Sequence, residues 1–542
     1  MAARALLKRV LGSLPLTAEA AQSLRSPDQP AIPDYRLDRL AQALPGWCAA
    51  ARDVRRTARP GKPKRLLVLG YLPWWLEYAS ALGLVLASQG HEVELAFLPY
   101  RNWQDGVEPF DLRRHRLYLK RALEPARPLL PLRDLSDGKP TGMPDDLAQA
   151  VMAQSKIDVQ YTAQREAVEL GDGGRDHGLY RLRLARNQAT AAAAYRLFAG
   201  RAYDAVVIPN GSILEFGAVY LAARHLGVPT VTYEFGERRE RMWVAHDSEV
   251  MRLDASALWE ARGSTPLADE ERESLRALYQ ARRAGVAWSN FERRWQAGES
   301  QGARSARQTL GIDPQRPMAL LCTNVVGDSL ALGRQVFTSG MADWLTQTVR
   351  NFAERPGAQL VVRVHPGELL GAGHPSVEIV RSEMPQLPSH VIVVPPESKI
   401  NTYDLIELAH LGLVYTTTVG LEMAMSGVPV VVAGQTHYRG KGFTVDPETL
   451  PEYRAAVGRL LDRPIGQPLE ASQVELATRY AYRFFFEFAF PFPWHLVTFW
   501  EDIAARPLEE MIQPAALGRY ARTLRALAGE PIEWGRGPSV DG

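Results

Sequence analysis

Cysteine is nearly absent from the chain, since only Cys48 and Cys322 occur among 542 residues. Two cysteines exclude a disulfide scaffold and a zinc site built on cysteine, and they suit a reducing cytosol. A strong net charge is absent as well, because 63 Lys and Arg oppose 61 Asp and Glu and leave a formal charge of +2. This balance gives no overall field that favours nucleic acid, so we expect no nucleic-acid partner.

The chain also lacks apolar runs of the kind that cross membranes. Residues 66–88 are mostly apolar, but Gly70, Pro73 and Glu77 interrupt them, which favours a buried strand followed by a buried helix. The aromatic stretch 482–500 contains charges and prolines, so we predict no transmembrane helix and a cytoplasmic protein. The basic N-terminus and the aromatic tail leave open a peripheral contact with the inner membrane.

Several catalytic signatures are missing too. There is no GxxxxGK[ST], which argues against P-loop chemistry, and no GxSxG, which argues against a nucleophile elbow. No DxD occurs, so a diphosphate bridged by a metal ion is not indicated and we expect no metal. A transferase without a metal would neutralise its leaving group with a helix N-terminus, histidine, lysine and arginine.

The chain does contain a repeated alternation of short apolar runs with helix-like segments. Such runs predict parallel strands buried on both faces, and they fall into two series. We therefore predict an α/β protein with two Rossmann-like, doubly wound domains whose strands end at a shared cleft. The predicted divisions are a helical N-terminal extension (1–60), an N-terminal domain with a helical insertion (61–260), a helical connector (261–312), a C-terminal domain (313–465) and an aromatic helical tail (466–542).

Three threonines stand where one apolar run passes into a helix. Thr416, Thr417 and Thr418 follow the run, and the predicted helix after them ends at Gly427. The hydroxyls and the free N–H groups of a helix start attract an anion, and Glu422 one turn later can accept from a sugar diol. Phosphate together with ribose indicates a nucleotide. Helix capping explains one threonine but not three.

Other polar residues follow neighbouring strands of the same half. His365 ends a strand before a proline, so its imidazole can donate to a phosphate oxygen. A buried histidine bonded to a backbone carbonyl is the alternative. The further candidates for contacts to the nucleotide are Asn324, Asn401, Tyr438 and Lys441.

In the first half, Glu215 and Glu234 follow apolar runs and are candidates for the general base that activates an acceptor hydroxyl. Helix capping or an exposed charge explains each of them equally well.

Four motifs of the second half stand in a characteristic order. They are VRVHPGE (362–368), SKINTYDLI (398–406), TTTVGLEMAMSGVPVVVAG (416–434) and HYRGKGFT (437–444). Together with YAYRFFFEFAFPFPW (480–494), they resemble the bacterial capsule polysaccharide biosynthesis glycosyltransferases, a group that includes the transferases for Kdo (3-deoxy-D-manno-oct-2-ulosonic acid). The first half agrees more loosely, through PNGS (209–212) and YEFGE (233–237).

This resemblance implies a GT-B architecture with a nucleotide-sugar donor in the C-terminal domain and a glycan or lipid-linked acceptor, with no separate cofactor. It implies that His365, Thr417 and Thr418 contact the nucleotide phosphate and that Glu422 lies near the ribose. The chain departs from the group by having threonines where serines are expected, and by its charged insertion at 110–200. CMP-Kdo is the typical donor of part of the group, and other nucleotide sugars fit the same scaffold.

Three other functions remain open on the sequence. One is transfer of a polyol phosphate, as in teichoic-acid polymerases. Another is epimerisation of a sugar nucleotide on the same scaffold. The third is a non-catalytic partner in a polysaccharide export complex.

Overall fold

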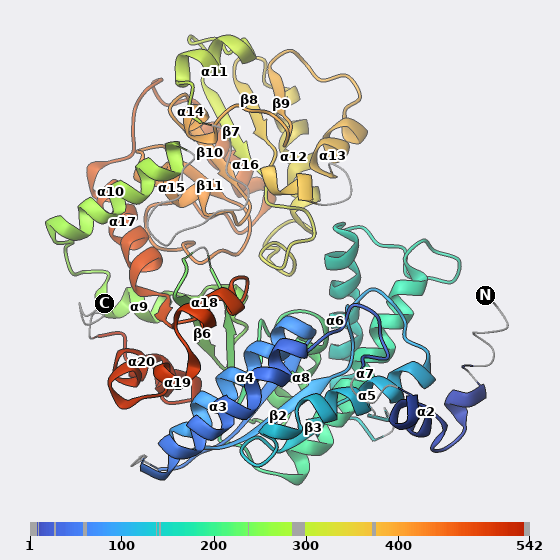
Figure 1. Cartoon of the computed structure of the whole chain (residues 1–542). Helices are drawn as coiled ribbons and strands as arrows, with labels where there is room; N and C mark the ends of the chain where they lie inside the picture. The colour runs from blue at the N-terminus through green and yellow to red at the C-terminus, as the bar shows by residue number, and fades with distance from the viewer. Residues whose placement is uncertain are drawn as a thin grey trace.

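The computed structural model contains two parallel sheets, each covered by helices on both faces (Figure 1). It describes residues 8, 10–25, 29–57, 62–136, 138–139, 142–236, 238–284, 299–370 and 375–535. The predicted α/β fold with two Rossmann-like, doubly wound domains is confirmed, and the arrangement is GT-B-like.

The N-terminal sheet has seven strands in the order β12-β6-β5-β4-β1-β2-β3. Strands β1 to β5 are parallel, and β6 and β12 are antiparallel to their neighbours. The apolar runs of the sequence at 65–71, 205–210 and 230–235 form β1, β4 and β5. The strands are β1 (Arg65–Tyr71), β2 (Glu92–Leu98), β3 (Leu132–Asp134), β4 (Ala205–Pro209), β5 (Thr230–Glu234), β6 (Arg241–His246) and β12 (Phe490–Pro491).

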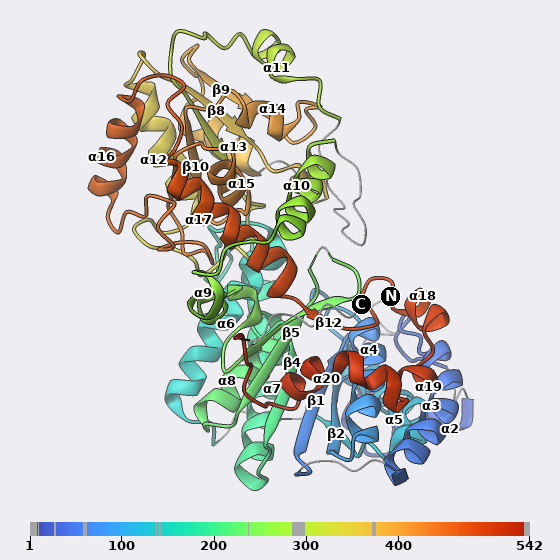
Figure 2. The same ribbon diagram turned by 90° about the vertical axis from the view of Figure 1, so that its left-hand side faces the viewer.

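Helices cover both faces of this sheet because its strands are apolar on both sides (Figure 2). Helices α3 and α4 lie on one face, and α6, α7 and α8 lie on the other. The charged insertion at 110–200 contains α5, α6 and α7 together with the short strand β3. The helices of this part are α2 (Thr17–Arg25), α3 (Asp38–Thr57), α4 (Pro73–Ser88), α5 (Pro109–Ala122), η1 (Glu124–Ala126), α6 (Asp145–Ala163), α7 (His177–Gly200), α8 (Leu214–His225), η2 (Val250–Arg252) and α9 (Ser256–Arg262).

The C-terminal sheet has five parallel strands in the order β11-β10-β7-β8-β9. They are β7 (Met318–Cys322), β8 (Gln359–Arg363), β9 (Val391–Val394), β10 (Leu411–Val414) and β11 (Val430–Val432). One apolar core joins the sheet to the side that carries α14, α15 and α17, and another joins it to α12, α13 and α16. The helices are α10 (Asp269–Ala284), α11 (Ala303–Leu310), α12 (Met341–Ala353), η3 (Pro366–Leu370), α13 (Pro375–Glu383), α14 (Thr402–Ile406), α15 (Val419–Met425) and α16 (Leu450–Leu461).

The aromatic tail links the two domains rather than standing apart from them. Helix α17 packs on α15, and β12 then joins the edge of the N-terminal sheet, where α19 and α20 also pack. The tail consists of α17 (Ala471–Tyr482), the π-helical turn η4 (Arg483–Glu487), β12, α18 (Phe499–Ala505), α19 (Leu508–Met511) and α20 (Pro514–Leu527). Among the described helices, none has the length and apolar character needed to cross a membrane.

Candidate functional site

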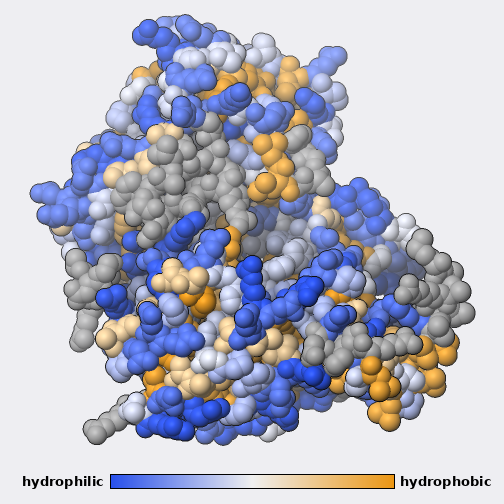
Figure 3. Space-filling model, viewed as in Figure 1, coloured by the Kyte–Doolittle hydropathy of each residue, from blue (hydrophilic) through white to orange (hydrophobic). Residues whose placement is uncertain are grey.

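A cavity of about 730 Å3 lies between the two sheets, lined by residues of both domains and of the tail. Polar residues that follow β7, β8 and β10 form its C-terminal wall, because the carboxyl ends of parallel strands meet at one edge of a sheet. Figure 3 shows the notch that separates the two parts of the molecule and the hydrophilic residues that cover most of the visible surface. The predicted shared cleft is therefore present.

The lining of this cavity is strongly cationic. Six of its residues are arginines, whereas Asp328 is the one acid among the described residues that line it. Burial raises the pKa of the Asp328 carboxyl above its usual value. Arg282 and Arg252 pair with acids outside the lining, Glu422 and Glu249, and the excess of positive charge that remains favours an anionic ligand. The arginines are Arg238, Arg241, Arg252, Arg282, Arg334 and Arg363.

His365 lies in this wall with a defined proton position. Its backbone N–H donates to the Thr323 hydroxyl over 3.0 Å, and its Nδ1 accepts from the Gly367 N–H over 2.9 Å. An acceptor at Nδ1 places the proton of the neutral imidazole on Nε2. A Cβ at Gly367 would lie 2.8 Å from that Nδ1, so the tight turn needs glycine there. The neutral His365 imidazole thus carries its N–H at Nε2.

The three threonines form an adjacent part of the wall, at the start of α15. Asn324 holds the first of them, because its side-chain oxygen accepts from the Thr416 N–H over 3.1 Å. Tyr438 is fully buried and donates from its hydroxyl to the Thr417 carbonyl over 2.6 Å. Thr418 stands at the N-cap position, yet its side chain makes no capping bond. Capping therefore does not account for this hydroxyl.

Two arginines flank this wall on the side of α14 and α15. Arg363 donates from Nη1 to the Pro395 carbonyl over 2.9 Å, while its Nη2 is buried without a hydrogen-bond partner in the described structure. Burial lowers the pKa of Arg363, although a guanidinium remains charged at neutral pH. Arg282 pairs with Glu422 and lies over the Phe485 ring at 4.3 Å. The Nη2 of Arg363 is therefore a buried donor that the described structure leaves unsatisfied.

Glu234 ends β5 on the N-terminal side. Asn210 donates from Nδ2 to its carboxylate over 3.0 Å, and the Phe235 N–H donates over 3.1 Å. Burial raises the pKa of Glu234 to about 7. Its charge also reaches Tyr161, which lines the cavity, because both Asp328 and Glu234 raise the Tyr161 pKa after the larger effect of burial. Glu234 is thus a titratable carboxyl beside the cavity, although it is not itself among the lining residues.

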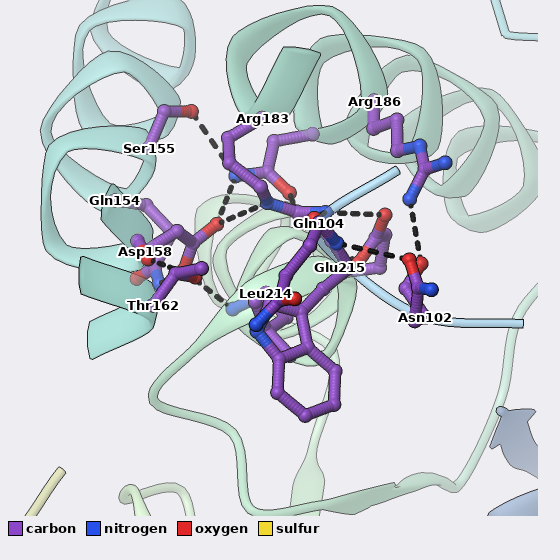
Figure 4. A network of polar contacts seen from close by, with 12 residues as sticks. Asn102, Gln104, Gln154, Ser155, Asp158, Thr162, Arg183, Arg186, Leu214 and Glu215 are labelled. Carbon is purple, nitrogen blue, oxygen red and sulfur yellow. Dashed lines mark hydrogen bonds and ion pairs between the residues drawn. The ribbon is translucent and has the colours of Figure 1, made fainter. Parts of the chain in front are cut away.

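Glu215 is placed differently from the expectation for a general base. Its carboxylate is fully buried and accepts from Arg183 over 3.0 and 2.8 Å, and Arg183 also pairs with Asp158 at 3.3 Å (Figure 4). Glu215 is therefore held in the scaffold of the N-terminal domain, because its oxygens accept from Arg183 and it is not among the residues that line the cavity. An acid that follows a strand in the sequence can equally point into the layer of helices.

Glu422, expected to contact the ribose, also lies behind the cavity lining. Its carboxylate is buried between Arg282 and the Tyr403 hydroxyl, which donates over 3.0 Å, and it does not line the cavity. Tyr438 supports the threonine loop from behind, and Lys441 donates to Ser256 over 2.9 Å away from the lining. Asn401 does line the cavity, but its side-chain oxygen caps α14 by accepting from the Tyr403 N–H.

Sequence reasoning missed several lining residues. Arg241, Arg252, Arg282 and Arg334 lie far apart in the sequence, outside any motif. A basic cluster at 238–241 was the one local signal for part of this set.

The segment from residue 279 to residue 471 matches the model of a family described as "Capsule polysaccharide biosynthesis protein". No curated protein matches the chain in sequence. Among solved structures, the chain is similar to KpsC, a beta Kdo 2,4 transferase of Thermosulfurimonas dismutans, with 20% identity over 51% of this chain and 79% of that chain and a TM-score of 0.33.

Two further structures cover more of the chain. The UDP-GlcNAc 2-epimerase of Neisseria meningitidis has 13% identity over 78% of this chain and 99% of that chain, with a TM-score of 0.24. The sucrose-phosphate synthase of Thermosynechococcus elongatus has 14% identity over 85% and 99%, with a TM-score of 0.28. The family match spans His365, the three threonines and three of the six arginines, and over residues 279–471 it confirms the resemblance to the capsule polysaccharide biosynthesis family.

Proposed function

We propose that the protein is a glycosyltransferase in the synthesis of a capsular or other surface polysaccharide. It moves a sugar from a nucleotide-sugar donor to a glycan or lipid-linked acceptor. The observation that carries the proposal is the cationic cavity between the two sheets, whose C-terminal wall lies in the segment that matches the capsule family. A donor with a phosphate leaving group fits such a lining.

In this proposal the nucleotide phosphate lies on the C-terminal wall. Arg363 and the Nε2–H of His365 donate to its oxygens, and the hydroxyls of Thr417 and Thr418 add neutral donors. The bond between the sugar and the phosphate oxygen breaks while a bond to the acceptor oxygen forms. Charge develops on the departing phosphate, and the fixed donors stabilise it without a metal ion.

Glu234 is the proposed general base for the acceptor hydroxyl. A carboxyl with a pKa of about 7 is ionised in a substantial fraction of molecules at neutral pH, and it is a stronger base than an ordinary glutamate. It takes the proton of the acceptor hydroxyl as the new bond forms. The donor proposed first is CMP-Kdo, and the site of action is the cytoplasm.

The test is thermal-shift binding with CMP, CDP, UDP, GDP and ADP. A nucleotide at a hundred times its dissociation constant should stabilise the folded protein by roughly 2.7 kcal/mol. Arg363→Gln and His365→Ala should lose most of this shift. The matched control is Arg454→Gln, because Arg454 is a surface residue bonded to Gln347. If none of the five nucleotides shifts the wild type, the transferase proposal fails.

A second experiment separates the proposal from the other functions. Sugar transfer requires an acceptor, whereas epimerisation of a nucleotide sugar proceeds without one. Binding without turnover in the presence of acceptor would favour a non-catalytic partner. Release of a nucleoside monophosphate together with a polyol phosphate product would favour the teichoic-acid type of transfer.

Contact with the inner membrane is proposed for the N-terminal helical region. Val10, Leu14, Leu16 and Leu24 are large apolar residues exposed there, and Figure 3 shows an orange patch over α2. Apolar side chains on a helical surface insert into the interfacial region of a bilayer. Co-sedimentation with anionic liposomes should be lost when Leu16 and Leu24 are replaced by serine. Equal sedimentation of both proteins would contradict the contact.

A further inference from the structure

The cavity has a second cationic side, formed by Arg334 and Arg252. Arg334 lies in the segment between β7 and α12, lines the cavity and is 5% exposed. Its guanidinium makes no hydrogen bond or ion pair with any residue that the structure describes. The guanidinium is not enclosed in apolar packing either, because none of its nitrogens is both fully buried and without a hydrogen-bond partner. The guanidinium therefore opens towards the cavity.

Arg252 belongs to the N-terminal domain and lies near Arg334. Burial, followed by the positive charge of Arg252, lowers the pKa of Arg334. Arg252 itself pairs with Glu249 at 3.1 Å, so one acid faces two arginines at this place. Two cations from different domains that share one acid leave an excess of positive charge at the interface between the domains.

This side adjoins the threonine end of the wall assigned to the nucleotide phosphate and lies away from Arg363. Arg363 bonds to the Pro395 carbonyl and reaches towards Thr402, on the side of the sheet that carries α14 and α15. Arg334 instead lies at the β11 edge of the sheet, because its carbonyl accepts from the Gln435 N–H, just after β11, over 2.7 Å. A phosphate held by Arg363, at the end of β8, leaves the guanidinium at the β11 edge for another anion.

We propose that Arg334, supported by Arg252, binds a second anionic group, a carboxylate or phosphate carried by the acceptor. The inference rests on the proposed function, because it places the acceptor in the same cavity as the donor. A guanidinium that is nine-tenths buried and unpartnered is costly to maintain unless a ligand pairs with it. The position beside the N-terminal domain assigns that ligand to the acceptor. The acceptor is therefore acidic.

The test uses inorganic phosphate as the probe at constant ionic strength. The full chain is first saturated with the nucleotide that stabilises it, and phosphate is then titrated while the melting midpoint is followed. We expect a further saturable rise in the wild type. Arg334→Gln should weaken phosphate binding about tenfold or more, the loss typical of one charge-assisted hydrogen bond. Arg363→Gln, the matched variant on the first wall, should weaken nucleotide binding and leave the effect of phosphate on the melting midpoint unchanged.

Three outcomes overturn the inference. One is a phosphate affinity that Arg334→Gln leaves unchanged. Arg334→Lys is the control variant that retains the positive charge. Another is competition between nucleotide and phosphate, which would place both on one site. The third is displacement of phosphate by the matching nucleotide sugar but not by the nucleotide, which would assign the anion to the transferred sugar. If no nucleotide binds but phosphate binding still depends on Arg334, the proposed function fails and the anion site is retained.

The final step measures transfer to an acidic oligosaccharide and to its carboxyl-reduced form. Arg334→Gln should raise the KM of the acidic acceptor about tenfold and leave the KM of the donor unchanged. It should have little effect on the reduced acceptor. An equal rise of KM for both acceptors would contradict recognition of the anionic group.

Discussion

Replacing Glu215 by alanine should unfold the N-terminal domain at a much lower temperature. The change removes the carboxylate that accepts two hydrogen bonds from Arg183, over 3.0 and 2.8 Å. Both side chains are completely buried, so water cannot replace the lost partner. Breaking a buried ion pair by removing one partner costs about 3–5 kcal/mol. At about 2–4 °C per kcal/mol for a domain of this size, the melting midpoint should fall by about 6–20 °C.

The substitution does not leave the charge of Arg183 without partners. Arg183 keeps Asp158 at 3.3 Å (Figure 4). It also keeps the Asn187 side-chain oxygen at 2.9 Å. Glu215→Gln keeps the shape and one oxygen acceptor, so it should lower the midpoint less than alanine does. Differential scanning calorimetry of wild type and both variants at pH 7 measures this series.

The pH dependence gives a second readout of the same pair. Burial raises the pKa of Glu215, but the Arg183 charge overcomes this effect and leaves the pKa below its usual value. A carboxyl with a lowered pKa in the fold stabilises above its unfolded pKa of about 4.3, and this contribution is lost as the pH falls. The difference in stability between wild type and Glu215→Ala should therefore shrink in acid. A variant that melts like the wild type but has lost turnover would refute this reasoning and return Glu215 to the active site.

Three further changes test the site and its support. Arg334→Gln should raise the melting midpoint of the ligand-free protein slightly, because it removes a desolvated cation that has no partner among the described residues; a fall of several degrees would show that its charge is satisfied within the fold. Glu234→Gln should abolish the limb of the activity profile with an apparent pKa near 7. It should also abolish a stabilisation that is present in acid and lost as the pH rises towards 7, since the pKa is raised in the fold; an unchanged profile argues against this base. Glu166 accepts from the Met341 and Ala342 N–H groups across the cleft, so Glu166→Ala should cost about 1 kcal/mol and increase the radius of gyration in small-angle scattering.

The strands of both sheets were predictable because their signal is local. Continuous apolar runs such as 65–71 correspond residue for residue to β1, since a parallel strand buried on both faces needs no polar position. Strand β6 was missed because its buried and less buried positions alternate and arginine begins it. Strand β12 was missed because it has only two residues, one of them a proline, and because its partner strand β6 is far away in the sequence.

The site was predictable where its residues follow strands in sequence. His365, Asn324 and the threonines come directly after β8, β7 and β10, and the strand order brings these three ends together. The direction of a side chain was not predictable in the same way. Glu215 and Glu422 also follow strands, but each lies on a helix whose inward face meets a buried arginine. Those arginines come from α7 and α10, and no local pattern links them to their acids.

Two buried arginines show how this chain separates scaffold from site. Arg183 and Arg334 are both withdrawn from water, at 0% exposure of the side chain and 5% of the residue respectively. The protein surrounds Arg183 with two carboxylates and an amide, so its charge is compensated before any ligand arrives. Around Arg334 the nearest strong influence is another arginine, and the open direction is the cavity. The same side chain at the same depth can be neutralised by its own fold or left for a ligand. The structure therefore predicts opposite stability changes for the two losses, a large decrease when the Arg183 pair is broken and a small increase when Arg334 is removed.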